Sequence, residues 1–306
     1  MLATETSRLA MNPGLRQDLV ASDGPLAGVT LKAVEPVGGG CIHQAWSLQL
    51  GDGRRLFVKS GEAGAINLFR VEADALEALH QHAEPGLLVV PQPLAMSQLP
   101  HGDVLLLPWL DLGGVDQRAL GRGLARLHRC SEAASPGTFG WHRDGFIGSG
   151  AQPAGWRNSW GACFVELRLR PQLQQADRLG FAPLVLDRLL TQLTNHLDRH
   201  APLPALVHGD LWGGNAGSLS DGRGALFDPA SYWADREVDL AMTRMFGGFD
   251  ASFYSAYNAE YPVAPGTEER IEIYNLYHLI NHANLFGGGY IKQSRASLQR
   301  LARLLS

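Results

Sequence analysis

The most informative segment of this 306-residue chain is Leu206-Val-His-Gly-Asp-Leu-Trp-Gly-Gly-Asn215. Its apolar start leads into His-Gly-Asp, and Asn215 follows Asp210 five positions later. A second segment, Ala225-Leu-Phe-Asp-Pro229, brings another aspartate eighteen positions after the first. Aspartate and asparagine are common in turns, so each segment alone fits a polar turn between two strands. Residues earlier in the chain favour a chemical role for both segments.

Three side chains in these segments have the types and the order that phosphoryl transfer from a nucleotide uses. In kinases, one aspartate meets the acceptor hydroxyl, while an asparagine and a later aspartate hold magnesium on the phosphates. The corresponding residues here are Asp210, Asn215 and Asp228. Phosphoryl transfer depends mainly on positioning and charge stabilisation, and these three side chains can supply much of both.

A glycine-rich turn precedes these segments in the first part of the chain. Strands are predicted over residues 29–34, 45–50 and 56–59. Gly38, Gly39 and Gly40 lie between the first two strands, where backbone N–H groups can cover nucleotide phosphates. A glycine triplet by itself is more often a flexible hairpin. Cys41 follows it, and is predicted to be an inert small side chain. The alternative is oxidation that disturbs ATP binding or links two chains.

A lysine and a glutamate strengthen the prediction of a nucleotide site. Lys59 ends the third strand, and a helix predicted over residues 69–80 places Glu72 beside an apolar stripe. A strand lysine paired with a helix glutamate holds the lysine of a kinase against the α- and β-phosphates. Solvated side chains are the alternative for both residues. The kinase-like order of the glycines, Lys59, Glu72 and the later polar residues favours the pair.

The segment Pro108-Trp-Leu-Asp111 is the one plausible domain boundary. Proline lacks an N–H but keeps its carbonyl, so the Pro108 C=O and the Leu110 N–H can meet an adenine edge. The prediction is an α+β, protein-kinase-like bilobal fold. Residues 1–108 form a small β-rich nucleotide-binding lobe, and residues 109–306 form a larger, mainly helical lobe for catalysis and substrate binding.

Several features of the second lobe are also predicted. Residues 136–160, rich in Gly, Trp and Phe, indicate a long loop, and residues 164–199 are largely helical. His128 is expected to be a packed or hydrogen-bonded structural residue. In the helix that begins near residue 235, early acidic residues suit the helix dipole. Asp239 is expected to point inward and bind the backbone of the His208–Asp210 loop, with a position on the surface as the alternative.

Together these segments resemble the fructosamine kinase (ketosamine-3-kinase) family, within the aminoglycoside-phosphotransferase-like kinases. The resemblance covers about Ala33 to Tyr290. Its most specific pieces are the segments 206–215 and 227–230, with Asp235-Arg-Glu-Val-Asp-Leu-Ala-Met242 and Arg168-Leu-Arg-Pro-Gln-Leu173 in addition. It implies ATP-dependent phosphorylation of the sugar 3-hydroxyl of a ketosamine, the product of amine glycation. Because that 3-phosphate leaves spontaneously, the reaction would serve deglycation.

The resemblance also implies a role for each matching residue. It makes Asp210 the base, Asn215 and Asp228 the Mg²⁺ ligands, and Lys59 with Glu72 the clamp on the phosphates of ATP. Trp212 would line the sugar pocket, with a core aromatic under the loop as the alternative. The implied partner is a small ketosamine or a glycated protein amine.

The chain departs from the family pattern in the segment 136–160. Asp144 is followed by Gly145 and Phe146 instead of the usual Asn, and Ala151-Gln-Pro-Ala154 lacks the Asn of a Pro-Gln-x-Asn element. Both changes concern the acceptor and not the phosphate residues. An aminoglycoside or another hydroxyl acceptor therefore stays open as an alternative. A nucleotide-binding pseudokinase scaffold is disfavoured, because the base and both metal ligands are present.

Composition and charge are typical of a soluble globular protein with 45% hydrophobic and 18% charged residues. A net charge of −4 and a pI near 6.2 give no reason to expect a nucleic-acid partner. The apolar run 104–110 is far shorter than the roughly 20 residues that span a membrane. Three widely spaced cysteines, Cys41, Cys130 and Cys163, fit a reducing cytoplasm better than a disulfide framework.

Overall fold

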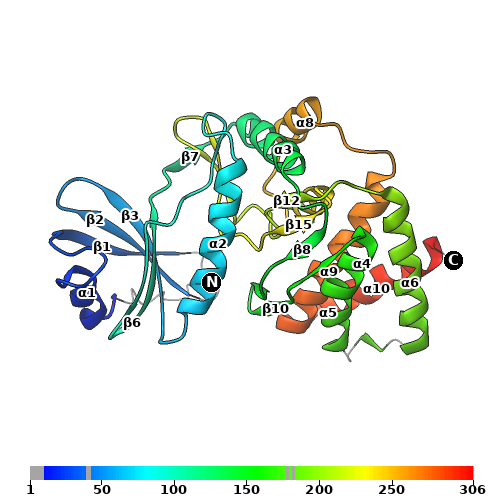
Figure 1. The fold of residues 1–306 in the computed structure, drawn as a ribbon, viewed down its shortest axis with the longest axis horizontal. Helices are drawn as coiled ribbons and strands as arrows, with labels where there is room; N and C mark the ends of the chain where they lie inside the picture. Colours follow the sequence, from blue (N-terminus) through cyan, green and yellow to red (C-terminus); the bar gives the residue numbers. More distant parts are fainter. Residues whose placement is uncertain (1–9, 39–42, 177–178, 181–182, 306) are drawn as a thin grey trace, which may run out of the picture. The chain divides into compact units, whose positions relative to one another are not determined.

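The computed structural model describes residues 10–38, 43–176, 179–180 and 183–305 (Figure 1). The chain folds into two compact units: unit 1 is Met1–Glu77 with Pro91–Asp111, and unit 2 is Ala78–Val90 with Leu112–Ser306. Unit 1 therefore extends three residues past the expected boundary at residue 108, and residues 78–90 belong with unit 2. Among the described residues, no helix combines the length and the apolar character that crossing a membrane requires.

Unit 1 is built on an antiparallel sheet of five strands in the order β1-β2-β3-β6-β5. Its elements are α1 (Pro13–Val20), β1 (Leu31–Val37), β2 (Gln44–Leu50), β3 (Arg55–Gly61), β5 (Ala95–Leu99), β6 (Gly102–Pro108) and the part of α2 (Ile66–His82) up to residue 77. The strands and the helix expected before residue 108 are present, with ends that differ by a few residues.

Apolar residues of alternate strand positions form the core of unit 1. Leu48, Val58 and Leu106 from three neighbouring strands are almost completely buried, and Leu15 and Leu19 of α1 belong to the same cluster. Since successive side chains of a strand point to opposite faces, this alternation assigns one face of the sheet to the core. Helix α2 follows β3 directly, which brings the ends of the two elements into reach of each other.

Unit 2 contains most of the helices and three small sheets (Figure 1). Its helices after residue 111 are α3 (Arg118–Ala133), α4 (Trp160–Phe164), the π-helical turn η1 (Val165–Leu169), α5 (Arg170–Gln174), α6 (Pro183–His200), α7 (Glu237–Met245), α8 (Ala251–Glu260), α9 (Thr267–Phe286) and α10 (Gly289–Leu304). Its strands are β4 (Leu88–Val89), β7 (Leu112–Gly114), β8 (Phe139–Trp141), β9 (Gly145–Ile147), β10 (Gly150–Gln152), β11 (Gly155–Arg157), β12 (Ala205–Val207), β13 (Ala216–Leu219), β14 (Gly224–Leu226) and β15 (Tyr232–Ala234). The predicted α+β class is confirmed.

The prediction of a long loop over residues 136–160 was wrong. Four short strands, β8 to β11, occupy this segment; β9 pairs with β10, and β8 joins β11 to β15. Each strand has only three residues, too few to show a periodic pattern among so many glycines. The pairing with β15 places this segment beside the strand that follows Asp228, so its position is fixed by the fold.

Candidate active site

The turn after β12 is anchored by a buried side chain. The carboxylate of Asp239, on α7, accepts the His208 N–H over 2.7 Å and the Gly209 N–H over 2.9 Å. This confirms the expectation that Asp239 points inward. Burial raises the pKa of Asp239, but the contacts with His128, His208 and the Gly209 N–H together lower it below its ordinary value. A charged, fully buried carboxylate therefore fixes the loop that carries Asp210.

The ring of His208 adds a second attachment. Its Nε2 lies 2.9 Å from the Phe227 carbonyl, and its Nδ1 lies 3.2 Å from the backbone nitrogen of Asp210. A carbonyl only accepts and a backbone N–H only donates, so the ring carries its proton on Nε2 and is neutral. Burial also lowers the pKa of His208. The neutral ring links the two segments that contain Asp210 and Asp228.

A glycine lets these two segments approach each other. Gly209 has φ +82°, and a Cβ atom there would lie 2.2 Å from the Ala230 carbonyl oxygen. The Ala230 N–H donates to the His208 carbonyl over 2.9 Å. Any side chain at position 209 would separate the segments, because a carbon atom cannot approach an oxygen so closely.

Asn215 joins the three residues expected to form the site. Its amide nitrogen donates to the Asp210 carbonyl over 2.9 Å, to Asp210 Oδ2 over 3.0 Å, and to the Asp228 carbonyl over 3.4 Å. The Phe227 N–H returns to the Asn215 carbonyl over 3.0 Å. The structure thus brings Asp228 into contact with Asp210 and Asn215, although Asp228 lies eighteen positions after Asp210 in the sequence.

The carboxyl group of Asp210 has a strongly shifted pKa. Burial raises this pKa to about 7; the hydrogen bond from Asn215 lowers it, and the charge of Asp228 raises it further. A carboxyl group that titrates near neutral pH can accept a proton at one step and release it at another. Shifts of this kind are common among catalytic groups.

The residues expected to hold magnesium fit that ion chemically. The nitrogen of the Asn215 amide is directed at Asp210, which leaves the Oδ1 oxygen as the ligand atom. Asp228 contributes a half-buried carboxylate from a left-handed backbone, with φ +55°. Carboxylate and amide oxygens are the donors that hard divalent cations prefer. The hydrogen bond from Asn215 to the Asp228 carbonyl keeps the two residues adjacent.

His128, expected to be structural, is completely buried under this loop. Its Nε2 lies 3.1 Å from Asp239 Oδ2, and its Nδ1 lies 2.9 Å from the hydroxyl of Tyr257. Helices α3, α7 and α8 each contribute one residue to this chain of contacts. The structure therefore confirms that His128 supports the loop from below through Asp239.

Unit 1 carries the other residues singled out from the sequence. The ammonium group of Lys59, at the end of β3, donates to both Glu72 oxygens over 2.8 and 2.9 Å, and both side chains are largely buried. Pro108 ends β6, and Leu110 follows it within the same unit. Gly38 is exposed at the end of β1. Gly39, Gly40 and Cys41 lie outside the described residues.

The side chain of Trp212 is 37% exposed. The alternative that it is a core aromatic under the loop is therefore wrong. Its ring meets Phe246 edge-on, with centroids 6.3 Å apart and an interplanar angle of 75°. A large aromatic ring held open to solvent beside Asp210 is available to contact a bound molecule.

Sequence reasoning missed the way Arg168 and Gln152 support the site. Arg168 lies on the π-helical turn η1, with its guanidinium carbon 4.0 Å from the centre of the Tyr232 ring and one nitrogen 3.1 Å from the Pro153 carbonyl. Gln152 donates to the Ala230 carbonyl over 3.0 Å and accepts the Tyr277 hydroxyl. The sequence pointed to Arg168 only through the family motif 168–173, and that motif does not reveal which residues Arg168 contacts.

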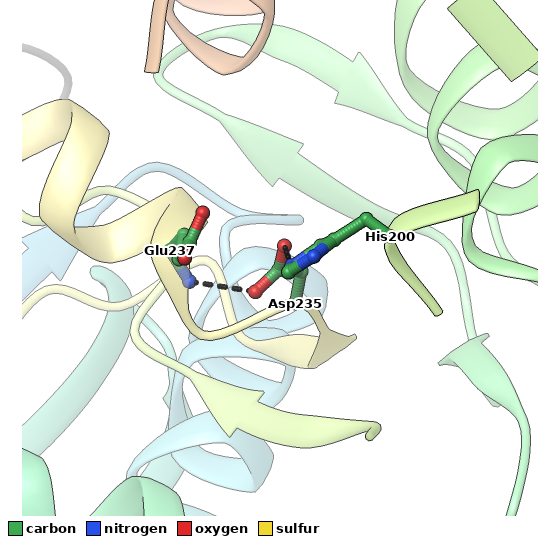
Figure 2. A group of neighbouring side chains, drawn as sticks. All are labelled: His200, Asp235 and Glu237. Carbon is green, nitrogen blue, oxygen red and sulfur yellow. Dashed lines mark hydrogen bonds and ion pairs between the residues drawn. The ribbon is translucent and has the colours of Figure 1, made fainter. Parts of the chain in front are cut away.

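Unit 2 also contains a second cluster of polar residues, formed by a histidine and two carboxylates (Figure 2). Within the described part of the chain, His200, Asp235 and Glu237 form the one set of histidines and carboxylates close enough together to hold a metal ion. Glu237, however, binds the Arg270 guanidinium over 2.7 and 3.0 Å. Asp235 accepts the Tyr274 hydroxyl over 2.6 Å, the Glu237 N–H over 3.0 Å, and lies 3.1 Å from His200 Nε2. This cluster is a buried structural network whose carboxylates already have partners.

Comparison with known proteins identifies the family to which this chain belongs. The family model described as Fructosamine kinase matches residues 18–304. Over 274 residues the chain is 41% identical to a probable ketoamine kinase of Synechocystis, covering 88% of this chain and 90% of that protein.

Solved structures extend the likeness. A candidate fructosamine-3-kinase of Haemophilus somnus superposes with a TM-score of 0.80 at 28% identity, covering 93% of this chain and 96% of that one. The macrolide 2'-phosphotransferase MphH of Brachybacterium faecium, at 16% identity and a TM-score of 0.54, shares the fold over 89% of this chain and 94% of that one. The expected protein-kinase-like fold is thereby confirmed.

Proposed function

This chain belongs to the fructosamine kinase family and is an ATP-dependent phosphotransferase, and we propose that its acceptor is the sugar 3-hydroxyl of a ketosamine. The observation that carries the proposal is the convergence of Asp210, Asn215 and Asp228 through the amide of Asn215. It provides one carboxyl group that titrates near neutral pH beside two oxygen donors suited to a metal ion.

In this proposal Asp210 orients the acceptor and takes its proton. The carboxylate accepts a hydrogen bond from the 3-hydroxyl, the hydroxyl oxygen forms a bond to the γ-phosphorus, and the bond from that phosphorus to ADP breaks. The hydroxyl proton passes to Asp210, whose pKa of about 7 lets it return the proton to water after the transfer. Asp239 and His208 hold the backbone on either side so that Asp210 keeps its position.

Asn215 and Asp228 would hold Mg²⁺ through Oδ1 and a carboxylate oxygen. When bound, the ion would offset negative charge on the phosphate oxygens of ATP. The hydrogen bond of 3.4 Å from the Asn215 amide to the Asp228 carbonyl supports this assignment, because a metal site needs its donors close together.

The remaining assignments follow the same proposal. Lys59, fixed by Glu72, would bind the α- and β-phosphates, and Gly38, Gly39 and Gly40 would cover them with backbone N–H groups. The carbonyl of Pro108 and the N–H of Leu110 would bind adenine, and Trp212 would contact the sugar. Residues 1–108 would then serve the nucleotide, and residues 109–306 catalysis and the acceptor.

The product explains the proposed biological role. A ketosamine 3-phosphate loses its phosphate readily and decomposes to free the amine, so phosphorylation would reverse glycation. The acceptor would be a small ketosamine or a glycated amine of a protein. The need for ATP and the sparse cysteines favour the cytoplasm as the compartment.

The direct experiment measures ADP formation with ribulosamines, fructosamines and aminoglycosides, with the phosphate position determined by NMR. We expect phosphate on the 3-oxygen of a ketosamine and little turnover of aminoglycosides. Phosphorylation of an aminoglycoside in preference to every ketosamine would overturn the acceptor assignment.

Two variants test the residue roles. Asp210→Asn should lower kcat by the order of 10² or more while ATP affinity changes little. Asp228→Ala should weaken Mg-ATP binding far more than adenosine binding. The control is Asp187→Asn, which alters an exposed carboxylate paired with Arg170 on the surface and should change neither quantity. Unchanged Mg-ATP affinity in Asp228→Ala would remove Asp228 from the metal site.

A further inference from the structure

A continuous row of aromatic rings begins in the loop that carries Asp210 and runs across unit 2. Successive ring centres are 6.3, 5.0, 5.0 and 6.4 Å apart. We call this set the aromatic row; it consists of Trp212, Phe246, His282, Tyr290 and Phe286. The rings come from the catalytic loop, the segment after α7, helix α9 and helix α10.

The aromatic row is open to solvent. Trp212 is 37% exposed, Phe246 38% and Phe286 65%. One exposed aromatic side chain is ordinary, but adjoining exposed rings are not, since burying each would stabilise the fold. The aromatic row starts at Trp212, two residues after the proposed base, and further ring contacts lead from Phe246 to Phe286.

The beginning of the aromatic row is fixed to the catalytic loop. A Cβ atom on Gly213 would lie 3.0 Å from the Cα atom of Gly248, so the two backbones touch. Gln117 clamps the same segment, donating to the Gly248 carbonyl over 2.8 Å and accepting the Asp250 N–H over 2.8 Å. Phe246 is therefore held in a defined position relative to Trp212.

We propose that the aromatic row binds the amine side of the acceptor. The perpendicular rings of Trp212 and Phe246 receive the secondary ammonium group of the ketosamine, and the substituent on its nitrogen lies along Phe286 and Tyr290. This inference rests on the proposed ketosamine kinase function.

The chemistry of the ketosamine supports this occupant. Its nitrogen is four bonds from the oxygen of the 3-hydroxyl, so a hydroxyl held at Asp210 brings the ammonium close to the same loop. Faces of aromatic rings attract cations, and contacts of this type change affinity by about 3- to 30-fold. An apolar substituent that leaves the nitrogen needs an apolar surface beyond it, which the outer rings provide.

The first test varies the nitrogen substituent on one sugar. In the wild-type protein, kcat/KM for an N-benzyl ketosamine should exceed that for the N-methyl compound by roughly 5- to 30-fold. Phe286→Ser should bring this ratio close to one. Leu203→Ser replaces an apolar side chain of nearly the same exposure, 64%, outside the aromatic row and should leave the ratio unchanged. Substitution of such exposed side chains should not impair folding.

The second test concerns the charge. A 1-O-benzyl ketose replaces the ammonium with a neutral ether, and wild type should prefer the N-benzyl compound by about 3- to 30-fold. Phe246→Leu keeps an apolar side chain but removes the ring, and should reduce that preference.

Three outcomes would overturn the inference. A benzyl-to-methyl ratio near one in wild type, with ketosamines phosphorylated normally, would reject the aromatic row and keep the proposed function. An unchanged ratio in Phe286→Ser would do the same. A loss of self-association in Phe286→Ser during gel filtration, with the ratio unchanged, would show that the row joins copies of this chain. If no ketosamine is phosphorylated at all, the proposed function itself fails.

Discussion

Asp239 accepts the backbone N–H of His208 over 2.7 Å, and this contact ties helix α7 to the loop that carries the proposed base. The other oxygen of Asp239 accepts the N–H of Gly209, and His128 approaches the first oxygen from below. Each oxygen of the carboxylate thus faces at least one donor. A group with a single acceptor oxygen cannot reproduce this arrangement.

Asp239→Asn should therefore destabilise the protein. Whichever way the new amide turned, its NH₂ group would face a backbone N–H or His128, leaving buried donors unpaired at a cost of about 3–5 kcal/mol. Chemical denaturation should show this loss in the free energy of unfolding, and kcat should fall as well. The exposed Asp221→Asn is the matched control. A loss below about 1 kcal/mol would contradict the anchoring role.

The pH dependence of turnover should report Asp210. Since burial raises its pKa to about 7, kcat/KM for the nucleotide should fall tenfold per pH unit below that value, as the carboxylate becomes protonated. Circular dichroism at each pH would verify that the fold is intact. A flat profile down to pH 5 would exclude a base that titrates in this range.

The same pKa predicts how Asp210 affects stability without magnesium. The folded chain keeps a proton that an ordinary carboxyl, with a pKa of 3.8, has lost in the unfolded chain. The contribution of Asp210 to the free energy of unfolding is therefore greatest below a pH of 3.8. It declines as the pH rises from there to about 7. Asp210→Asn should remove this decline and be more stable than wild type at pH 8, by on the order of 2–4 kcal/mol, but not at pH 4. If the free energy of unfolding differed equally between Asp210→Asn and wild type at both pH values, the protonation of Asp210 would not be coupled to folding.

The ion pair of Lys59 and Glu72 should matter for the nucleotide more than for the fold. Glu72→Gln weakens a charged hydrogen bond of 2.8 Å and should lower kcat/KM for ATP by about 10- to 150-fold. Asp52→Asn, which breaks the exposed pair with Arg54, is the control and should have little effect. If both variants behaved alike, Lys59 would have no special role in binding phosphates.

The sugar of the acceptor should be short. Gly145 in β9 and Ala154 offer no polar side chain where the family has asparagine, and Phe146 and Trp156 nearby are exposed. Extra hydroxyls of a longer sugar would lose water without gaining partners. With one amine throughout, a ribulosamine or erythrulosamine should exceed the fructosamine in kcat/KM by roughly 5- to 150-fold. A clear preference for the fructosamine would contradict the inference that Gly145 and Ala154 leave the hydroxyls of a longer sugar without partners.

The residue pattern alone singled out Asp210, Asn215 and Asp228, which the structure brings into contact. The apolar run before His208, the spacing to Asn215 and the position of Asp228 follow rules that act over a few residues. The inward position of the Asp239 side chain was also expected, although an aspartate in the first turn of a helix suits the helix dipole as well. Strands in unit 1 were predicted because their alternation extends over seven residues.

Contacts between distant segments could not be predicted in the same way. Asp235 and Glu237 were expected to serve the helix dipole, whereas both are buried and bound to His200 and Arg270. Nothing near residue 235 in the sequence identifies those partners. The aromatic row is a similar case, because its rings come from four segments of the chain that only the folded structure brings into contact.

The left-handed backbone of Asp228, with φ +55°, has a consequence for anyone who engineers this protein. Aspartate adopts that conformation at a cost that glycine does not have. Asp228→Gly would relax the backbone and remove the carboxylate proposed to bind the metal. A directed-evolution screen that rewards heat resistance alone would therefore favour this replacement and accumulate inactive protein. Each round should select for turnover as well as for survival on heating.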